Sequence, residues 1–524
     1  MTFIRRVKNN DNVYVYEVQT YREKGTNKVK QNTTYLGKEI IENGKAIILP
    51  PKRKMKHLRE VLDYGQAMAL FKLADDFGLP DIIEDCIGQS TRINDVGLKI
   101  TIMAINSIIS EMTIQSIGHW YSRNSLKKRL SITPDDFTPK KVRTLLEFIG
   151  SKTPDVIGLI EEGIAKRIME LNKDDLDMVV YDLTALRYYG ENNNLAQYGH
   201  VYRTTGEKQI NMVMAVTMKH KLPVHHKILP GKIVSVSTIH SFLKELDMFG
   251  ITNAVLVLDR GFYSKRNVNE MLNAKNDVIG ALSSSLAITK KALTNSIDIE
   301  NSRYRIKYPD QIMFAKEFNI DGIRIIVYHD SKKRSRQLET FYEQLNEVEN
   351  KLFELKDKTF EQKQELLDEL KGVCGIYAKY FSIKHVYSDT WRFRFKLKHK
   401  SVQRFTNRLG KTVLFTSTSL DVVDILKTYR EKDVIEKAFQ LMKKHGLAKV
   451  NSNLEESTKA RVLLSYLGYL LLNLLRMKLD DKISLEKALT HLDEVREVVY
   501  KDESMEISEL TKQQKEVLKK LEMM

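Results

Sequence analysis

Two patterns typical of buried strands, each ending in an aspartate, most constrain what this chain can fold into. Residues 177–182 are Asp-Met-Val-Val-Tyr-Asp, and residues 254–259 are Ala-Val-Leu-Val-Leu-Asp. A continuous run of aliphatic residues bounded by polar ones is typical of a strand buried on both faces, which occurs mainly in sheets covered by helices. We therefore predict that Asp182 and Asp259 end two strands of one such sheet.

The surrounding sequence predicts the rest of this sheet. Strand patterns occur at 210–218, 224–229 and 277–282, and helical patterns occur at 238–249 and 264–273. Three strands in succession, followed by alternating helices and strands, predict a mixed α/β sheet.

Further elements are predicted on both sides of the sheet. Strands at 13–18 and 33–36 around a turn at Gly25-Thr26-Asn27 predict an N-terminal hairpin. Apolar residues at helical spacing then predict the helices 68–77, 96–112, 139–149 and 155–171. After the sheet, residues 338–355 and 362–373 predict a helical hairpin, and residues 420–445 predict a helix with Ser419 as its N-cap.

The charge balance points to an anionic partner. The 524 residues include 85 lysine and arginine against 68 aspartate and glutamate, which gives a formal net charge of +17 and a pI near 9.3. A chain this basic usually binds nucleic acid, although ribosomal and membrane-surface proteins share this balance.

Cysteine usage and hydropathy exclude several classes of protein. Cys86 and Cys374 lie far apart and form no C-x-x-C pair, which argues against a disulfide framework and a thiolate zinc site. No apolar run follows the first residues, so no signal peptide is predicted. The longest apolar stretch, 462–477, is short for a membrane span and predicts a buried core helix.

Carboxylates at strand ends have the chemistry for binding hard cations. Ligands of open α/β sheets bind beside the carboxyl ends of strands. Magnesium prefers carboxylate oxygens and keeps waters for substrate phosphates, and two ions about 4 Å apart can stabilise both oxygens of an in-line displacement. A third carboxylate, Glu436, lies in the predicted helix 420–445. By themselves these residues are weak evidence, because aspartate is also a common turn former.

Four motifs, taken together and in order, resemble the DDE transposases of bacterial insertion sequences. They are Tyr181-Asp182-Leu183-Thr184, Gly199-His200, Leu229-Pro230-Gly231 and Leu258-Asp259-Arg260-Gly261-Phe262. In that family a ribonuclease-H-like core carries the first aspartate on its first strand, the second at the end of its fourth, and a glutamate on a helix after a long insertion. The resemblance covers 177–283 and 412–480 and implies that Asp182, Asp259 and Glu436 are the catalytic residues and metal ligands.

A spaced Tyr, Arg, Glu, Lys signature of many such transposases has a counterpart here. Tyr429 is followed by Lys432, Glu436 and Lys443 with the family's gaps of two, three and six residues. Lys432 replaces the usual arginine, and the nearby Arg430 could supply a guanidinium from a different helical angle. The resemblance implies DNA contacts for the four basic or aromatic residues, Tyr429, Arg430, Lys432 and Lys443, and favours the IS-four superfamily.

The resemblance also implies the reaction and its partners. Such enzymes bind the terminal inverted repeats of their element, pair two ends as a homodimer, cut a strand and join the freed 3′-hydroxyl to target DNA. Two Mg²⁺ ions, for which Mn²⁺ can substitute, serve every phosphoryl transfer. The expected partners are therefore DNA and a second copy of the chain, without ATP or a membrane. The expected location is the bacterial cytoplasm, at the nucleoid when DNA is bound.

One strand in the predicted insertion has two different faces. Residues 391–398 alternate strictly, with the apolar side chains of Trp391, Phe393, Phe395 and Leu397 on one face. The other face carries Arg392, Arg394, Lys396 and Lys398, which we expect to contact DNA phosphates. In several relatives a flipped base stacks on an aromatic residue of the insertion. Trp391 is the candidate for that role, with simple core packing as the alternative.

The predicted division of the chain has six parts. They are a basic β-hairpin region at 1–55, a helical region at 56–172 that binds DNA ends, a first part of the catalytic core at 173–283, an insertion at 284–417, a second part of the core at 418–480, and a helical C-terminal region at 481–524.

Three other interpretations stay open at this point. A ribonuclease-H-like nuclease that cuts without joining would carry the same acids. A transposase-derived DNA-binding protein could retain the acids without activity. The heptad-like pattern of 334–373 alone would fit a structural coiled-coil protein, but that leaves the α/β pattern unexplained.

Overall fold

The computed structural model describes residues 2–9, 12–22, 29–42, 45–50, 57–87, 93–110, 114–151, 155–233, 235–447, 450–480 and 482–524. Two compact units are present, one formed by residues 1–62 with 496–508 and the other by 63–495 with 509–524. The predicted turn at Gly25-Thr26-Asn27 lies outside the described residues. The six-part division stays a prediction.

The first unit consists of strands. One antiparallel sheet has the order β1-β2-β3-β4, with the bounds β1 (Thr2–Asn9), β2 (Asn12–Arg22), β3 (Val29–Glu42) and β4 (Lys45–Leu49). A second sheet has the order β19-β18-β5, with the bounds β5 (Leu58–Asp63), β18 (Arg496–Tyr500) and β19 (Met505–Ile507). The predicted N-terminal strands are present as the antiparallel pair β2 and β3, and β1 and β4, which the sequence did not predict, extend this pair to a four-stranded sheet. The C-terminal region is not wholly helical, because β18 and β19 pair there.

In the described residues, the second unit begins with six helices, which include the four predicted at 68–77, 96–112, 139–149 and 155–171. They are α1 (Gly65–Phe77), α2 (Leu79–Ile87), α3 (Val96–Ile109), α4 (Ile117–Ser122), α5 (Pro139–Ile149) and α6 (Val156–Leu171). Gly78 closes α1 with φ of 79°, a left-handed conformation that a residue without a Cβ adopts at no steric cost. Buried residues of all six helices share one hydrophobic cluster with the sheet that follows.

A mixed sheet confirms the predicted α/β core. Five of its strands follow the order β9-β8-β6-β10-β11, in which β6, β9, β10 and β11 run in one direction and β8 runs antiparallel to its neighbours β6 and β9. The bounds are β6 (Met178–Arg187), β7 (Gln197–Tyr198), β8 (Lys208–Thr217), β9 (Pro223–Pro230), β10 (Val255–Leu258) and β11 (Asp277–Ala281). Two helices, α7 (Ile239–Met248) and α8 (Lys265–Asn273), connect the last three strands.

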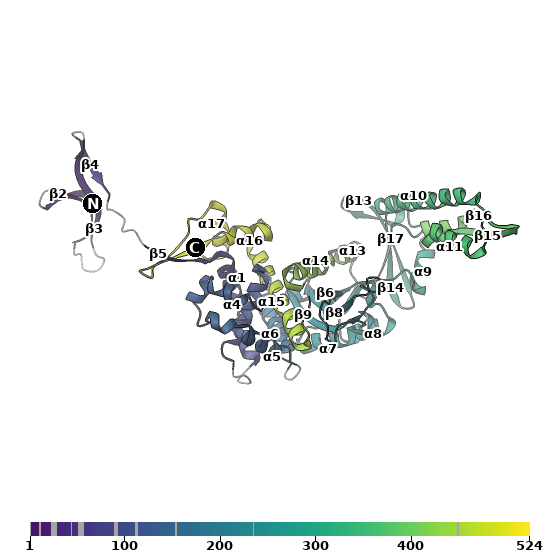
Figure 1. Ribbon diagram of the computed structural model, residues 1–524, viewed down its shortest axis with the longest axis horizontal. Helices are drawn as coiled ribbons and strands as arrows, with labels where there is room; N and C mark the ends of the chain where they lie inside the picture. Colours follow the sequence, from purple (N-terminus) through teal and green to yellow (C-terminus); the bar gives the residue numbers. More distant parts are fainter. Residues whose placement is uncertain are drawn as a thin grey trace. The chain divides into compact units, whose positions relative to one another are not determined.

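The insertion extends the same sheet (Figure 1). The order continues from β11 through β17 (Lys411–Thr416), β14 (Ile323–Asp330), β13 (Gln311–Ile320) and β12 (Arg305–Tyr308). A separate hydrophobic cluster lies under the rest of the insertion. That part contains the predicted helical hairpin and a β-hairpin, with the bounds α10 (Ser331–Lys356), α11 (Lys363–Cys374), β15 (Phe381–Ser388), β16 (Thr390–Leu397) and α12 (His399–Thr406). A short helix, α9 (Ala287–Thr294), precedes β12.

The C-terminal helices return to the core sheet. They are α13 (Val422–Glu431), α14 (Asp433–Met442), α15 (Glu455–Leu479), α16 (Leu485–Asp493) and α17 (Lys512–Lys520). The predicted single helix at 420–445 is wrong in two respects. The chain breaks into α13 and α14 at Lys432, and Asp421 rather than Ser419 caps α13 by accepting the backbone N–H of Val423 at 2.8 Å.

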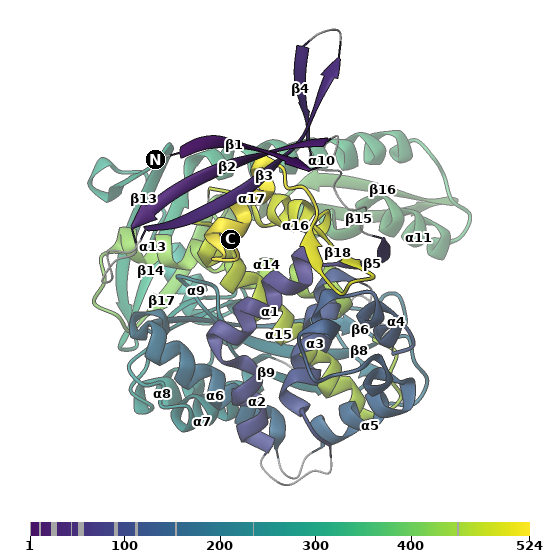
Figure 2. The same cartoon turned by 90° about the vertical axis from the view of Figure 1, so that its left-hand side faces the viewer.

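The long helix α15 confirms the prediction of a buried core helix. By length and composition it could cross a membrane, but 78% of its most apolar window is buried inside the protein. It packs against α1, α3, α5 and β9, and Figure 2 shows it running between the N-terminal helices and the sheet. Burial on all sides explains why its sequence has no polar face.

Candidate active site

Asp182 and Asp259 lie side by side because their strands are parallel neighbours. Leu258, the last residue of β10, is paired with Tyr181 of β6, so Asp182 is the next residue of β6 and Asp259 is the first residue after β10. The prediction that Asp182 ends its strand is wrong. β6 continues to Arg187 because β8 pairs with it throughout, while the pairing with β10 ends at Leu258. Both carboxylates therefore lie just beyond the point where the pairing between β6 and β10 ends.

Helix α14 brings Glu436 to the same place. Glu436 lies in the first turn of α14, not in the middle of a long helix as expected. Unsatisfied backbone N–H groups and the helix dipole favour a negative charge in this first turn. The break at Lys432 therefore gives Glu436 a helix N-terminus of its own.

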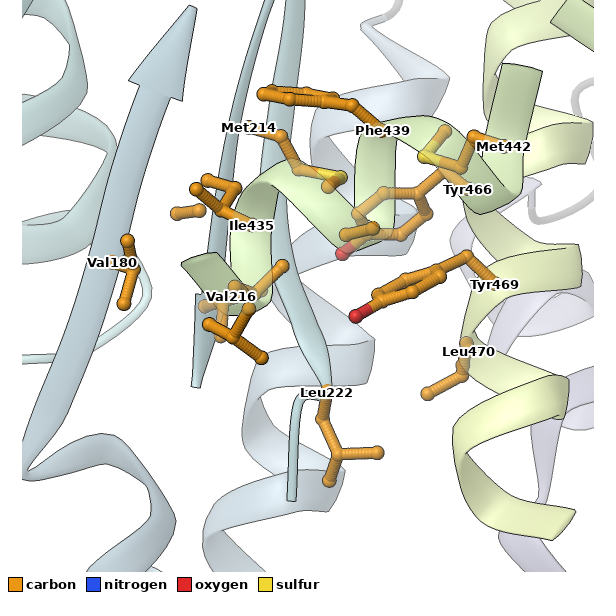
Figure 3. Packing of buried hydrophobic residues seen from close by; sticks show 14 of the residues in the cluster. Val180, Met214, Val216, Leu222, Ile435, Phe439, Met442, Tyr466, Tyr469 and Leu470 are labelled. Carbon is orange, nitrogen blue, oxygen red and sulfur yellow. The ribbon is translucent and has the colours of Figure 1, made fainter. Parts of the chain in front are cut away.

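Apolar packing fixes α14 across the sheet (Figure 3). The buried side of the helix, with Ile435, Phe439 and Met442, faces Val180 of β6 and Met214 and Val216 of β8. Tyr466, Tyr469 and Leu470 of α15 close the other side of this contact. Val180 and Asp182 point to the same face of β6, because side chains alternate along a strand. The packing that buries Ile435 therefore holds the neighbouring Glu436 on the face that carries Asp182.

A lysine links two of the acids. The Lys432 ammonium lies 3.2 Å from Oε1 of Glu436 and 3.6 Å from Oδ1 of Asp259. Its side chain is only 15% exposed, whereas those of Asp259 and Glu436 are 42% and 56% exposed. Tyr429 adds a hydrogen bond from its hydroxyl to Oδ1 of Asp259, at 3.2 Å. Three residues of the spaced signature thus converge on one acidic centre.

The charges of this centre act on Asp182. Burial raises the pKa of Asp182 to about 6, and the negative charges of Asp259 and Glu436 also raise it. The Leu183 backbone N–H and the Lys432 ammonium act in the opposite direction. Three carboxylates therefore share a space whose negative charge is only partly compensated.

The chemistry of this centre fits divalent cations, but its present geometry is not a finished metal site. Carboxylate oxygens from separate elements, open to solvent on one side, are the ligands that Mg²⁺ and Mn²⁺ use beside phosphates. Within the described ranges, no group of three His, Cys, Asp or Glu side chains is arranged so that it could hold one ion. The Lys432 ammonium stands between two of the carboxylates instead.

The remaining signature positions lie in different surroundings. Lys443 donates a hydrogen bond to Oγ1 of Thr184 at 2.9 Å, on the face of β6 that carries Asp182, and burial lowers the pKa of Lys443. Arg430 instead contacts the insertion, where its guanidinium donates to Gln311 at 2.8 Å and stacks 4.6 Å from the Tyr308 ring. Its guanidinium is therefore held by residues of β12 and β13. A DNA contact for Arg430 stays a prediction.

The hairpin of β15 and β16 carries the other predicted DNA-contacting residues. Arg392, Arg394, Lys396 and Lys398 are all exposed, and Lys384 stands opposite Arg394 on β15. Because β16 ends at Leu397, Lys398 lies outside the strand, at the start of α12. The hairpin therefore presents a basic face, as predicted, although its contacts with DNA remain to be tested.

Trp391 is partly buried against the second hydrophobic cluster. Its ring lies 5.0 Å from that of Tyr387, and the Lys363 ammonium lies 5.2 Å above it. Tyr387 is 63% exposed, which makes it the more accessible ring at this tip of the hairpin. The stacking of a flipped base on Trp391 stays a prediction.

Two motif glycines serve packing rather than chemistry, a role that their sequence did not reveal. A Cβ on Gly231 would stand 2.1 Å from the carbonyl oxygen of Gln209, and one on Gly199 would overlap the Gln209 side chain. The Gly231 carbonyl accepts hydrogen bonds from the side chains of Gln209 and Asn211, both at 3.1 Å. These glycines allow the chain to cross closely at the edge formed by β7, β8 and β9.

Comparison with known proteins gives one informative match. The family model described as "Transposase DDE domain" matches residues 176–471. No curated protein sequence matches the chain. Among solved structures, the cryo-EM structure of a piggyBac transposase synaptic complex with hairpin DNA is similar, with a TM-score of 0.40 and 11% identity over 82% of this chain and 79% of that chain. A likeness at this level decides nothing about the chain's activity.

The family match spans β6, β10 and α14, the elements that carry the three acids. DDE domains of this kind generally use divalent metal ions and act on DNA. Because the match covers more than half of the chain, the protein belongs to the transposase DDE domain family and is a DNA transposase.

Proposed function

We propose that Asp182, Asp259 and Glu436 are the catalytic carboxylates of a metal-dependent DNA cleavage and strand-transfer reaction. The observation that carries this proposal is their convergence. Asp182 and Asp259 follow a paired position of two parallel strands, and Glu436 shares the Lys432 ammonium with Asp259. The negative charges of Asp259 and Glu436 both raise the pKa of Asp182.

The strand order supports a ribonuclease-H-like core as the finer description of the fold. In this proposal β6, β8, β9, β10 and β11 are its five strands, with the first aspartate on the first strand and the second after the fourth. The spacing of Tyr429, Lys432, Glu436 and Lys443 supports the Tyr-Arg-Glu-Lys class of the IS-four superfamily of bacterial insertion sequences.

Each group of the centre has a part in the proposed mechanism. When bound, two Mg²⁺ ions would activate the attacking water or 3′-hydroxyl and stabilise charge on the phosphate. The three carboxylates would hold these ions, and Mn²⁺ would serve in their place. Tyr429 would orient Asp259 through its hydrogen bond, and Lys443 would hold Thr184 of β6 next to Asp182.

The wider proposal concerns partners. Terminal inverted repeats and target DNA would be the substrates, a second copy of the chain would complete the DNA complex, and neither ATP nor a membrane would take part. Exposed basic residues on the hairpin of β15 and β16 support contacts with phosphates. We place this activity in the bacterial cytoplasm.

The decisive experiment compares Asp182→Asn, Asp259→Asn and Glu436→Gln on a labelled terminal-repeat duplex. Each variant should lose nicking and joining while it still shifts the duplex in a gel, because DNA is held mainly by basic residues elsewhere. Asp433→Asn is the matched control, since Asp433 lies in the same first turn of α14 but pairs with the exposed Lys437.

Two outcomes would count against the proposal. Full cleavage by one of the three variants removes that residue from the site, and full cleavage by all three removes the mechanism. Nicking by the unaltered protein without joining of a 3′-hydroxyl end would instead favour the alternative of a nuclease that cuts only.

A further inference from the structure

We propose that the Lys432 ammonium is the resident counter-cation of the acidic centre and that a divalent cation must displace it to bind. The proposal rests on the proposed function of the three acids and adds a role for the one signature position that departs from the family. In place of a phosphate-binding arginine, this chain has a lysine whose ammonium lies beside two carboxylates and 5.6 Å from the centre of the Tyr429 ring.

The burial of Lys432 calls for a physical reason. A lysine side chain normally keeps its ammonium in water, and removing that charge from water is costly unless it is paired. The Lys432 side chain is 15% exposed, while Lys437, one helical turn later, is 74% exposed. Lys432 also lies at the junction of α13 and α14, which aims it between Asp259 and Glu436. Pairing with two carboxylates compensates its desolvation.

Lysine and metal compete for the same atoms. Oδ1 of Asp259 and Oε1 of Glu436, which face the ammonium, are oxygens that a divalent cation would need as ligands. With the ammonium between them, the described residues offer no three-ligand group ready for an ion. A lysine can leave such a position easily, because its compact charge sits on a flexible four-carbon stem. Once displaced, the ammonium is available to a DNA phosphate.

The first test measures Mn²⁺ binding to the full-length protein without DNA by isothermal titration calorimetry. Lys432→Gln should bind Mn²⁺ about tenfold more tightly than the unaltered protein, because it removes a competing cation held by two partly exposed ion pairs. Lys432→Arg keeps the charge and should bind no more tightly than the unaltered protein. Lys437→Gln removes an equal charge from the same helix and should leave the affinity unchanged.

A second test needs no variant and stands even if Lys432→Gln fails to fold. Amine-reactive labelling of the unaltered protein, followed by mass spectrometry, should show several-fold faster modification of Lys432 when Mn²⁺ is added. Labelling of Lys437 should not change. If labelling of Lys432 stays the same or slows with Mn²⁺, the ammonium is not displaced and the inference is wrong.

The outcomes separate this inference from the proposed function. If Asp182→Asn abolishes Mn²⁺ binding but Lys432→Gln leaves the affinity unchanged, the proposed metal site is supported and the counter-cation role of Lys432 is wrong. If Asp182→Asn leaves Mn²⁺ binding intact, or the unaltered protein binds no Mn²⁺, the metal site itself is wrong and the inference falls with it.

Discussion

The hydroxyl of Tyr429 donates a hydrogen bond to the carboxylate of Asp259 across 3.2 Å, although 169 residues separate them in the chain. Burial raises the pKa of Tyr429, and the neighbouring charge of Asp259 raises it further. The phenol therefore keeps its proton at neutral pH and remains a donor. Through this bond, the end of α13 orients a carboxylate at the end of β10.

Tyr429→Phe should slow DNA cleavage about tenfold, because a hydrogen bond to a charged group contributes about 1.5 kcal/mol at the low end of its range. Binding of the terminal repeat should change little. Single-turnover nicking rates and gel shifts would measure the two effects. Tyr342→Phe, on the exposed surface of α10, is the control. An unchanged nicking rate in Tyr429→Phe would show that Asp259 is oriented without this bond.

A buried cluster joins helix α6 to strand β9. The Glu161 carboxylate faces His225 at 3.0 Å and His226 at 2.5 Å, and the other nitrogen of His225 lies 2.9 Å from Glu245 of α7. Burial alone would raise the pKa of Glu161, but the two histidines lower it to about 2. Burial alone would lower the pKa of His225, but Glu161 and Glu245 raise it to about 9.

This cluster predicts how stability depends on pH. The pKa of His225 is raised from 6.5 in the folded protein. Its contribution to the free energy of unfolding is therefore complete below pH 6.5 and is lost as pH rises through about 9. The contribution of Glu161, whose pKa is lowered from 4.5, is complete above pH 4.5 and lost as pH falls toward 2. Urea unfolding should therefore show the largest effect of this cluster between these limits, near pH 5 to 6.5.

Glu161→Gln should cost about 3 kcal/mol of unfolding free energy, because it leaves buried histidines without their partner. The difference in unfolding free energy between Glu161→Gln and the unaltered protein should become smaller above pH 9, where His225 is neutral in both proteins. Glu162→Gln removes a neighbouring carboxylate whose partner Lys166 is 60% exposed, and should cost no more than about 0.5 kcal/mol. Equal losses in the two variants would contradict the prediction.

Neutralising Arg392, Arg394, Lys396 and Lys398 together should weaken DNA binding and flatten its salt dependence. Each lost phosphate contact removes about 0.9 from the slope of log K against log salt. Titrations at several salt concentrations would measure the slope. Four exposed lysines of α10, Lys332, Lys333, Lys351 and Lys356, provide a control with the same change in charge. If both quadruple variants change the slope equally, only net charge matters and the hairpin face has no special role.

We expect residues 1–170, which combine the basic N-terminal region with the helical region, to carry most recognition of the DNA ends, because the catalytic core must act on varied target DNA. Helices α1 to α6 share the hydrophobic cluster of the catalytic sheet, so a protein beginning near residue 172 would lose part of its core. Deleting residues 1–50 instead removes β1 to β4 and keeps β5 with β18 and β19. Residues 1–50 hold 9 lysine and arginine against 5 aspartate and glutamate, so this deletion removes net positive charge and should weaken binding to the terminal repeat several-fold. An unchanged preference for the repeat over random DNA would place recognition elsewhere.

The sequence alone determined the elements whose signal is local. Runs such as 254–258 and 462–477 are apolar on every side, and burial is the only stable environment for such a strand or helix. The order of the motifs around Asp182 and Asp259 likewise depends on sequence only, and it was enough to indicate the transposase DDE domain family that the comparison later showed.

Only the tertiary structure decided how these elements meet. That β6 runs on past Asp182, that the insertion adds its strands to β11, and that β1 and β4 widen the N-terminal sheet all depend on pairing between distant residues, which local patterns do not encode. The contacts of Lys432 and Arg430 likewise could not be predicted from the local sequence. Both are basic residues of one short segment, yet one lies between two carboxylates and the other against the insertion, because the break between α13 and α14 sets their directions.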